Sequence, residues 1–179
     1  MARETAGDGV DTQEVADGIY MVDTLMLGHE GHTATFIVTD EDETAVVETG
    51  LSNGVDRILG GLSSLGIAPE EVDYVFVTHA HLDHAGGAGY LADECGNATL
   101  VCHERAVEYL SEPDKVEKLV ESVRRAVGEL GDDYGDAKPV DRERFETVSG
   151  GETLDVAGHS FEVVEATGHA PHQFCVYDG

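Results

Sequence analysis

The sequence predicts an α/β fold of the α+β kind, in which strands outnumber the helices inserted between them. Short apolar or alternating runs, bounded by Gly, Asp and Pro, recur along the chain as they do in strands. Two longer segments repeat apolar residues every three or four positions, which is typical of one face of a helix. A length of 179 residues with 41% hydrophobic content suits one domain with a substantial core. We therefore expect a single domain over residues 1–179, with residues 1–10 frayed.

The first half of the chain predicts a β-meander, then a helix, then a buried strand. Ser52 and Asn53 precede the predicted helix as N-cap residues, and Gly66 follows its last residue, Leu65. A second, short helix is expected over residues 88–95. The predicted strands are separated by a Gly-rich turn, an acidic turn and the first helix, and they cover residues 18–26, 33–39, 45–48 and 72–77.

The second half of the chain alternates helices with further strands. A short buried strand is expected over residues 98–102, and His103 begins a helix after it. Apolar residues then keep one face of a longer helix from Val116 to Leu130, before a polar stretch at 131–139. The remaining strands are separated by short turns, and they are predicted over residues 145–148, 153–156, 159–165 and 174–177.

The chain is strongly acidic: 10 Lys and Arg stand against 37 Asp and Glu, a formal charge of −27 at pH 7. Such an excess destabilises a compact fold by self-repulsion, which salt at about 1 M screens because the Debye length falls to about 3 Å. The acids are spread along the chain, whereas an acidic face for a basic partner would gather them. We therefore interpret the surface as halophilic, adapted to high salt. Nucleic acid is disfavoured as a partner, because phosphates bind basic patches.

Neither a membrane span nor a signal peptide is predicted, because the first residues are polar and no apolar run approaches about 18 residues. We therefore expect a cytoplasmic protein without a membrane partner. Cys95, Cys102 and Cys175 are far apart and form no C-x-x-C pair, which argues against a disulfide framework and a cysteine zinc site. Each is expected to be a small buried hydrophobic residue.

The most informative stretch is Thr78-His79-Ala80-His81-Leu82-Asp83-His84, directly after the predicted strand 72–77. Histidine is the commonest protein metal ligand, and α/β proteins place ligands at the carboxyl ends of strands. A polar loop with coincidental histidines would explain one or two imidazoles, but it fits poorly with three and a carboxylate. The stretch therefore predicts a metal site.

The ligands divide into two groups by their spacing. His79 and His81 are two positions apart, so in an extended or loop backbone their side chains leave on one side and can bind one ion. Asp83 and His84 could face a second ion beside the first. A third ligand for the first ion must come from elsewhere, and His169, which follows a glycine at the end of another strand, is the best candidate.

Three protein ligands and one open position are the arrangement of a catalytic zinc, which lowers the pKa of its water to about 7. Asp83 is the candidate catalytic residue, because it could bind a second ion, orient the hydroxide, or pass a proton to the leaving group. His172 could be a further ligand, could hold a ligand in orientation from behind, or could be a turn histidine packed against Pro171. Iron and manganese also suit imidazole and carboxylate, so the ligands do not fix the metal.

Residues 78–87, THAHLDHAGG, resemble the H-x-H-x-D-H signature of the metallo-β-lactamase superfamily. Two supporting marks stand in the matching order, the strand and turn of residues 46–50 and the later Gly168-His169. The resemblance covers roughly residues 18–179. It implies an αββα sandwich with a dinuclear site at the sheet edges. By matching positions, the first metal would be bound by His79, His81 and His169, and the second by Asp83 and His84.

The chain departs from the family pattern in three ways. Glu48 stands where the strand-turn usually carries Asp, in a role that supports the ligands rather than binding the metal. Residues 166–169 read Ala-Thr-Gly-His, where Thr-Pro-Gly-His is common. The family's metal-bridging Asp and final His would lie beyond Gly179. We therefore expect a chain truncated at its C-terminus, with an incomplete second sheet whose exposed edge could self-associate.

Four other histidines carry weaker interpretations. His29 and His32 lie in a loop that overhangs the active site in the family, so each is either a substrate contact or a plain turn histidine. His103, which begins a helix, is interpreted as structural, and His159, in a turn, as solvated.

The leading hypothesis is a metal-dependent hydrolase with two zinc ions in an intact site. A metal-bound hydroxide would attack an ester, thioester, lactone or related bond of a small-molecule substrate, as in members that resemble hydroxyacylglutathione hydrolases or lactonases rather than nucleases. The alternative is an inactive or incomplete fragment that binds one metal through three His without turnover. Redox chemistry with iron is a third hypothesis, although such members typically carry Glu in place of one loop His.

Overall fold

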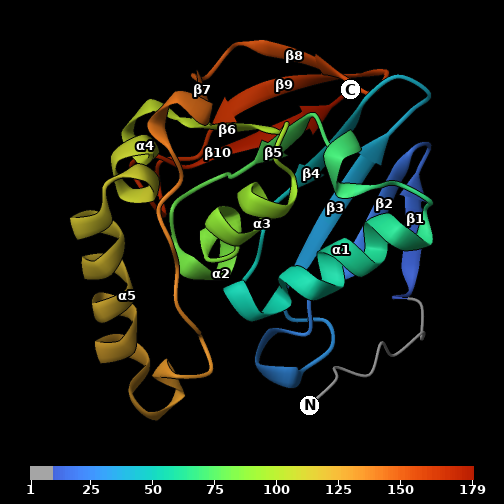
Figure 1. Cartoon of the computed structure of the whole chain (residues 1–179). Helices are drawn as coiled ribbons and strands as arrows, with labels where there is room; N and C mark the ends of the chain where they lie inside the picture. The colour runs from blue at the N-terminus through green and yellow to red at the C-terminus, as the bar shows by residue number, and fades with distance from the viewer. Residues whose placement is uncertain (1–9) are drawn as a thin grey trace.

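The computed structural model describes residues 10–179, which form two sheets and a layer of helices (Figure 1). A large sheet of seven strands lies between the helices and a small sheet of three strands. The predicted α+β class and the presence of a second sheet are therefore confirmed. Within this described part of the chain, the helices cover a single face of the large sheet.

The large sheet runs in chain order from its first strand to its seventh. Its first four strands are antiparallel neighbours, and the later neighbours are parallel. The first strand was absent from the sequence prediction, because its TQEVA side chains are largely exposed at the sheet edge and lack apolar alternation. The strands are β1 (Thr12–Ala16), β2 (Ile19–Asp23), β3 (Ala34–Thr39), β4 (Thr44–Val47), β5 (Tyr74–Phe76), β6 (Thr99–His103) and β7 (Phe145–Val148).

The small sheet consists of β8 (Thr153–Val156), β9 (His159–Glu165) and β10 (Phe174–Asp178). Its strands are antiparallel in the order β10-β9-β8, and all three agree with the sequence prediction. Side chains alternate along β10, so Phe174 is buried and Cys175 is exposed. The prediction of a buried Cys175 was wrong because nothing among the described residues covers the outer face of this edge strand, whereas Cys95 and Cys102 are buried as expected.

Three local features of the helices differ from the prediction. A single helical turn, α2, lies inside the histidine-rich stretch that was expected to be a loop. A 3-10 turn, Ser52–Gly54, precedes the first helix, and Asn53 donates to the Asp133 carbonyl at 2.9 Å instead of capping. The longest helix ends before Gly128, whose φ of 61° breaks it. The α-helices of the described residues are α1 (Val55–Ser64), α2 (Leu82–Ala85), α3 (Ala88–Glu94), α4 (Glu104–Ser111) and α5 (Pro113–Val127). Further 3-10 turns occur at Met26–Gly28, Pro69–Glu71, Gly128–Gly131 and Arg142–Arg144.

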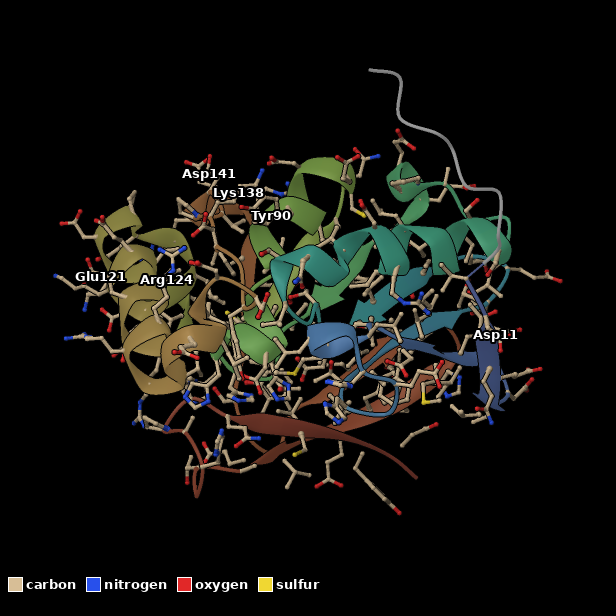
Figure 2. The ribbon with its side chains drawn as sticks, turned by 90° about the horizontal axis from the view of Figure 1, so that it is seen from below. Asp11, Tyr90, Glu121, Arg124, Lys138 and Asp141 are labelled. Carbon is tan, nitrogen blue, oxygen red and sulfur yellow. The ribbon has the colours of Figure 1, made fainter. Side chains whose placement is uncertain are left out.

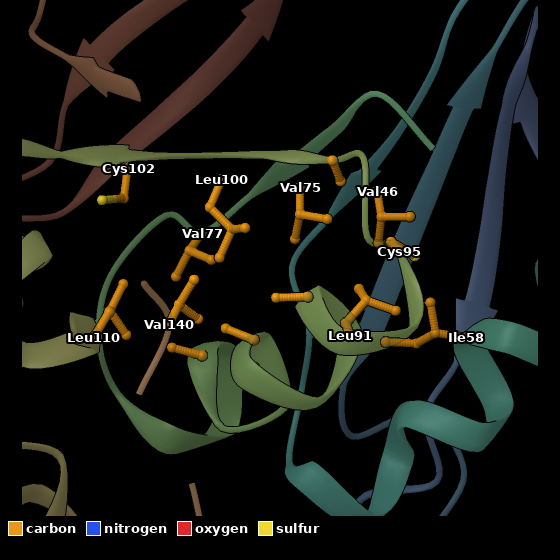
Figure 3. Close-up of a cluster of buried hydrophobic side chains, with 14 of the residues drawn as sticks. Val46, Ile58, Val75, Val77, Leu91, Cys95, Leu100, Cys102, Leu110 and Val140 are labelled. Carbon is orange, nitrogen blue, oxygen red and sulfur yellow. The ribbon is translucent and has the colours of Figure 1, made fainter. Parts of the chain in front are cut away.

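Strands β4, β5 and β6 of the large sheet are buried on both faces, and successive side chains enter two different cores. Figure 3 shows the core on the helix side, where Val46, Val75 and Leu100 pack with Ile58 of α1 and Leu91 of α3. The core between the two sheets takes the neighbouring residues Ala45, Phe76 and Val101, together with Phe161, Val163 and Phe174 of the small sheet. The carboxyl ends of β4 and β5 are therefore held from two sides.

Two of the few basic residues, Arg124 and Lys138, make ion pairs that hold the segment between α5 and β7 in place. Arg124 of α5 pairs with Asp136 at 2.6 Å, and Lys138 pairs with Asp93 of α3 while lying 4.6 Å from the centre of the Tyr90 ring. Figure 2 shows Arg124 on the longest helix and Lys138 beside Tyr90. Among the described residues, no helix has both the length and the apolar character that crossing a membrane requires.

The buried ring of Phe76 provides a test of the double-sided core. We expect Phe76→Ala to lower the free energy of unfolding by about 3–5 kcal/mol, because it leaves a cavity between the sheets. Val15→Ala is the control, since Val15 is 48% exposed, and it should change stability by less than about 0.5 kcal/mol. Urea unfolding at constant salt measures both variants. A loss below about 1 kcal/mol for Phe76→Ala would show that the two sheets do not share a core.

Candidate metal centre

The two sheets each bring one segment to the same place. The large sheet contributes residues 78–84, which follow β5, and the small sheet contributes the turn between β9 and β10, with His169 and His172. The backbone N–H of Phe174 donates to the Thr78 carbonyl at 3.2 Å, which joins the two segments directly. The site is therefore assembled from residues about ninety positions apart in the chain, as the 88 positions between His81 and His169 illustrate.

His79, His81 and His169 form a three-histidine cluster in which one nitrogen of each ring lies within 4.8 Å of the others. Nδ1 of His81 and Nε2 of His169 are 2.9 Å apart. Two nitrogens bound to a tetrahedral zinc at about 2.0–2.1 Å lie roughly 3.3 Å apart, so the spacing needs little change to suit one ion. These are the three residues that the sequence assigns to the first metal.

His79 supplies an independent sign that the cluster suits a metal. Its side chain is 1% exposed, and its Nε2 is buried without a hydrogen-bond partner. Burial, and then the neighbouring imidazoles, lower the pKa of His79 to about 3, so the ring is neutral at ordinary pH. A buried neutral imidazole with an unpartnered nitrogen is the form in which histidine binds metals.

Glu48 supports two residues of the histidine-rich stretch. It lies just after β4 and has a left-handed φ of 71°. This conformation is energetically unfavourable for a residue other than glycine, and here it accompanies contacts between the carboxylate and that stretch. It accepts a hydrogen bond from Thr78 Oγ1, and its Oε2 lies 3.3 Å from Nδ1 of His84. The hydrogen bond to Glu48 raises the pKa of His84 most strongly, against the opposing effect of burial.

Asp83 and His84 lie beside the three-histidine cluster without belonging to it. The ring centres of His79 and His84 are 4.2 Å apart, and Nε2 of His84 is 3.5 Å from Asp83 Oδ2. Asp83 and His84 are consecutive in α2, and their side chains approach each other beside the cluster. Both could face an ion next to the cluster, as the sequence suggests, but their own nitrogen and oxygen atoms do not join the close group.

His172 packs behind the cluster. It is 7% exposed, and its ring centre lies 6.5 Å from that of His79 and 5.6 Å from that of Tyr109. Burial lowers its pKa, and its Nδ1 has no hydrogen-bond partner. His172 therefore stands in the position of a residue that packs against the ligands, and its ring rests on Tyr109.

His29 and His32 lie on the loop before β3. Both are exposed, their ring centres are 5.2 Å apart, and neither belongs to the three-histidine cluster. Sequence reasoning missed two contributors, Thr78 and Tyr109. Thr78 Oγ1 donates to Glu48 and lies 3.1 Å from Nδ1 of His79. Its place at the start of the motif is the signal that could have identified it, whereas Tyr109 on α4 offered none.

A family model described as the metallo-beta-lactamase superfamily matches residues 27–179. A metallo-beta-lactamase fold-containing protein of Sulfurisphaera tokodaii is 28% identical over 142 residues, which cover 79% of this chain and 51% of that protein. The crystal structure of an archaeal metallo-beta-lactamase superfamily protein from Sulfolobus tokodaii superposes with a TM-score of 0.77 at 25% identity, covering 90% of this chain and 60% of the other.

Two further relatives differ in their chemistry. A nitric oxide reductase of Moorella thermoacetica is 27% identical over 107 residues, or 54% of this chain and 27% of the relative. An N-acyl homoserine lactonase of a Bacillus species is 38% identical over 64 residues, or 28% of this chain and 26% of the relative. The chain thus spans about half the length of the first relative and about a quarter of these two.

The low pKa of His79 predicts acid sensitivity of the metal-free protein. Unfolded His79 takes up a proton near pH 6.5, whereas folded His79 stays neutral down to about pH 3. The unfolded state binds more protons in this window, so the free energy of unfolding falls as pH is lowered through it. His79→Gln should reduce that slope by up to about 1.4 kcal/mol per pH unit. Urea unfolding between about pH 6.5 and pH 4 tests this, with Ser160→Ala as a non-titrating control. Identical slopes in His79→Gln and the parent would contradict it.

The contact between Glu48 and His84 predicts a change in the titration of one imidazole. Glu48→Gln should lower the pKa of His84, because it removes the hydrogen bond and charge that raise it. Asp83→Asn should lower it less, since the Asp83 charge is the weaker cause. NMR titration of the His84 ring in the metal-free protein gives both values. An unchanged His84 titration in Glu48→Gln would mean that Glu48 does not support this ring.

Proposed function

Because the chain belongs to the metallo-β-lactamase superfamily, we propose that it is a metal-dependent hydrolase acting on an ester, thioester, lactone or related bond of a small molecule. The observation that carries this proposal is the three-histidine cluster with its buried, unpartnered His79 nitrogen. The lactonase similarity supports the kind of bond attacked. A charge of −27 argues against a polyanionic substrate such as nucleic acid.

Each proposed residue has a distinct task. His79, His81 and His169 would hold the first metal, for which zinc is the expected ion, and Asp83 and His84 would contribute to a second. Zinc bound in this way supplies a hydroxide nucleophile at neutral pH and a positive charge that polarises the substrate carbonyl. Glu48 holds His84 and Thr78 in place, and His172 packs against the ligand rings. These contacts fix the ligand rings before substrate binds.

Asp83 is the proposed proton-transfer residue. Its side chain is 38% exposed, so solvent and a small substrate can reach it, and its Oδ2 lies 3.5 Å from Nε2 of His84. In this role the carboxylate takes a proton from the attacking water and returns it to the leaving group. His29 and His32 are the proposed substrate contacts of the exposed loop before β3. We also propose that the dispersed acidic residues adapt the protein to a salt-rich cytoplasm.

Two other functions remain as alternatives, each with its own supporting observation. A chain that binds one metal through three His without turnover would agree with a cluster that excludes Asp83 and His84. An iron-dependent redox protein would agree with the similarity to a nitric oxide reductase. Against the redox function, the histidine-rich stretch keeps three imidazoles and offers fewer carboxylates than iron chemistry of that kind typically uses.

Metal content and hydrolysis test the proposal together. The protein, purified in about 1 M KCl to screen its charge, should bind zinc and hydrolyse members of a panel of esters, thioesters and lactones in a chelator-sensitive way. His81→Ala should weaken zinc binding by more than about 100-fold, since even the loss of residues behind a ligand costs 10–100-fold. Ser160→Ala is the control, because it alters an exposed hydroxyl near the start of β9 that bonds only to Asp155 in the small sheet.

The outcomes separate the three functions. Zinc binding with chelator-sensitive hydrolysis that His81→Ala abolishes supports the hydrolase. One zinc per chain without turnover of any panel member supports the metal-binding alternative. Tightly bound iron with reduction of nitric oxide or oxygen supports the redox protein, and a folded protein that binds no metal contradicts all three.

A further inference from the structure

His159 joins the small sheet to the large one. It is the first residue of β9, and its Nδ1 lies 2.7 Å from Oδ2 of Asp178, the last residue of β10. On the other side, its Nε2 lies 3.0 Å from the carbonyl oxygen of Asp17, in the turn between β1 and β2. The side chain is 17% exposed and lines an open cavity, so His159 is solvated only in part, because both ring nitrogens face protein acceptors. Its ring also stacks on Phe161, with centres 5.5 Å apart.

Both partners of His159 are hydrogen-bond acceptors. A carboxylate and a backbone carbonyl cannot donate, and a neutral imidazole carries only one N–H. Both contacts can be hydrogen bonds only when the ring is an imidazolium, which donates from each nitrogen. Proton loss would break one of the two contacts and leave an acceptor facing a nitrogen lone pair. The geometry of the His159 contacts is thus specific for the charged form.

The groups around His159 are acidic. Asp178 comes from β10, the Asp17 carbonyl from the turn after β1, and Asp40 from the turn after β3. An open cavity of about 700 Å³ beside the ring is lined by Glu14, Asp17, Asp40 and Glu41, with no Lys or Arg among its lining residues. The pKa of Asp40 is lowered mainly by backbone N–H groups, with the His159 charge as a smaller contribution. Every charged group that lines this cavity beside His159 is therefore an acid.

The backbone at this junction allows the sheets to approach closely. Gly18 has a φ of 67°, and a Cβ there would lie 2.7 Å from the Thr39 carbonyl oxygen and 3.7 Å from Nε2 of His159. The neighbouring Ala157 N–H donates to Glu43 at 3.1 Å, a second contact between the β8–β9 turn and the large sheet. The His159 contacts are therefore part of a built junction between the two sheets.

The same hairpin carries one member of the three-histidine cluster. β9 and β10 pair from Phe161–Asp178 at one end to Glu165–Phe174 at the other, and the turn beyond that second end holds His169. His79 and His81, by contrast, belong to the large sheet. The position of the hairpin on the large sheet therefore decides whether His169 meets the other two rings.

We propose that His159 is a positioning residue. As an imidazolium it donates to Asp178 of β10 and to the Asp17 carbonyl of the large sheet, a pair of contacts called the clamp below. The clamp fixes the β9–β10 hairpin on the large sheet and so holds His169 within reach of His79 and His81. This inference rests on the proposed metal centre. Binding is reciprocal, so a metal bound by the three histidines should also stabilise the clamp.

The metal-free protein tests the contact between His159 and Asp178 within the β9–β10 hairpin, on which the charged form of the ring depends. His159→Ala, Asp178→Asn and the double variant form a double-mutant cycle, measured by urea unfolding at about pH 6 and about pH 8.5. We expect the coupling between the two substitutions to be larger at the lower pH than at the higher one, because a neutral ring has one N–H donor for two acceptors. Ser160→Ala is the matched control, because Ser160 Oγ donates to Asp155 of β8, within the small sheet, and this contact does not reach the large sheet. Absence of coupling at the lower pH, or the same coupling at both, would overturn the clamp.

Two readouts test the link from His159 to His169. The NMR signal of the His169 ring in the metal-free protein should shift in His159→Ala and stay in place in Ser160→Ala. Zinc affinity, measured by competition with a chromogenic chelator at about pH 6.5, should fall about tenfold in His159→Ala, by the loss of one charge-assisted hydrogen bond. An unmoved His169 signal would overturn the positioning role. If the parent protein binds no zinc, the proposed hydrolase fails, while unfolding and the His169 signal still decide the clamp.

Discussion

His169 reaches the three-histidine cluster from a different sheet than His79 and His81, and this constraint governs the rest of the structure. A cluster within 4.8 Å can form only if the small sheet keeps a fixed position on the large one. The core between the sheets, with Phe76, Phe161 and Phe174, gives that position its stability, although apolar packing alone has little direction. The direction comes from hydrogen bonds at each end of the hairpin, the Phe174–Thr78 contact beside the cluster and the His159 contacts at the far end.

The pKa values of two neighbouring histidines in the site are shifted in opposite directions. His79 is held neutral by burial, with its pKa near 3, while the carboxylate of Glu48 raises the pKa of His84, 4.2 Å away between ring centres. The His84 ring is also one of the neighbouring imidazoles that lower the pKa of His79. Burial and the Glu48 carboxylate thus act on two adjacent rings in opposite directions.

Much of the fold could be predicted from local pattern, because alternation and apolar runs determine which segments form strands. The exceptions are informative: β1 has no apolar face, Cys175 lies on the uncovered side of an edge strand, and α2 is one turn that no pattern marks. In the site, the spacing of His79 and His81 indicated a shared ion, and the structure brings His169 to them. The supporting contacts of Thr78, Tyr109 and His159 could not be predicted, since each depends on residues brought together only by tertiary packing.

Lys and Arg are scarce in this chain, and a histidine makes one of the contacts to a backbone carbonyl that arginine makes elsewhere in it. Arg144 donates to three backbone carbonyls between α3 and β6, Arg57 donates to the Asp23 carbonyl at 2.6 Å, and Arg105 donates to the Pro171 carbonyl at 3.2 Å, near the cluster. Each places a cation at a backbone carbonyl, as we propose that His159 does between the sheets. Arginine keeps its charge at any physiological pH, whereas histidine does not. At the inter-sheet junction of this chain, whose charge is −27, the proposed His159 imidazolium takes the place that arginine holds at the other carbonyls, and salt, which screens the surrounding acids, acts on the same junction.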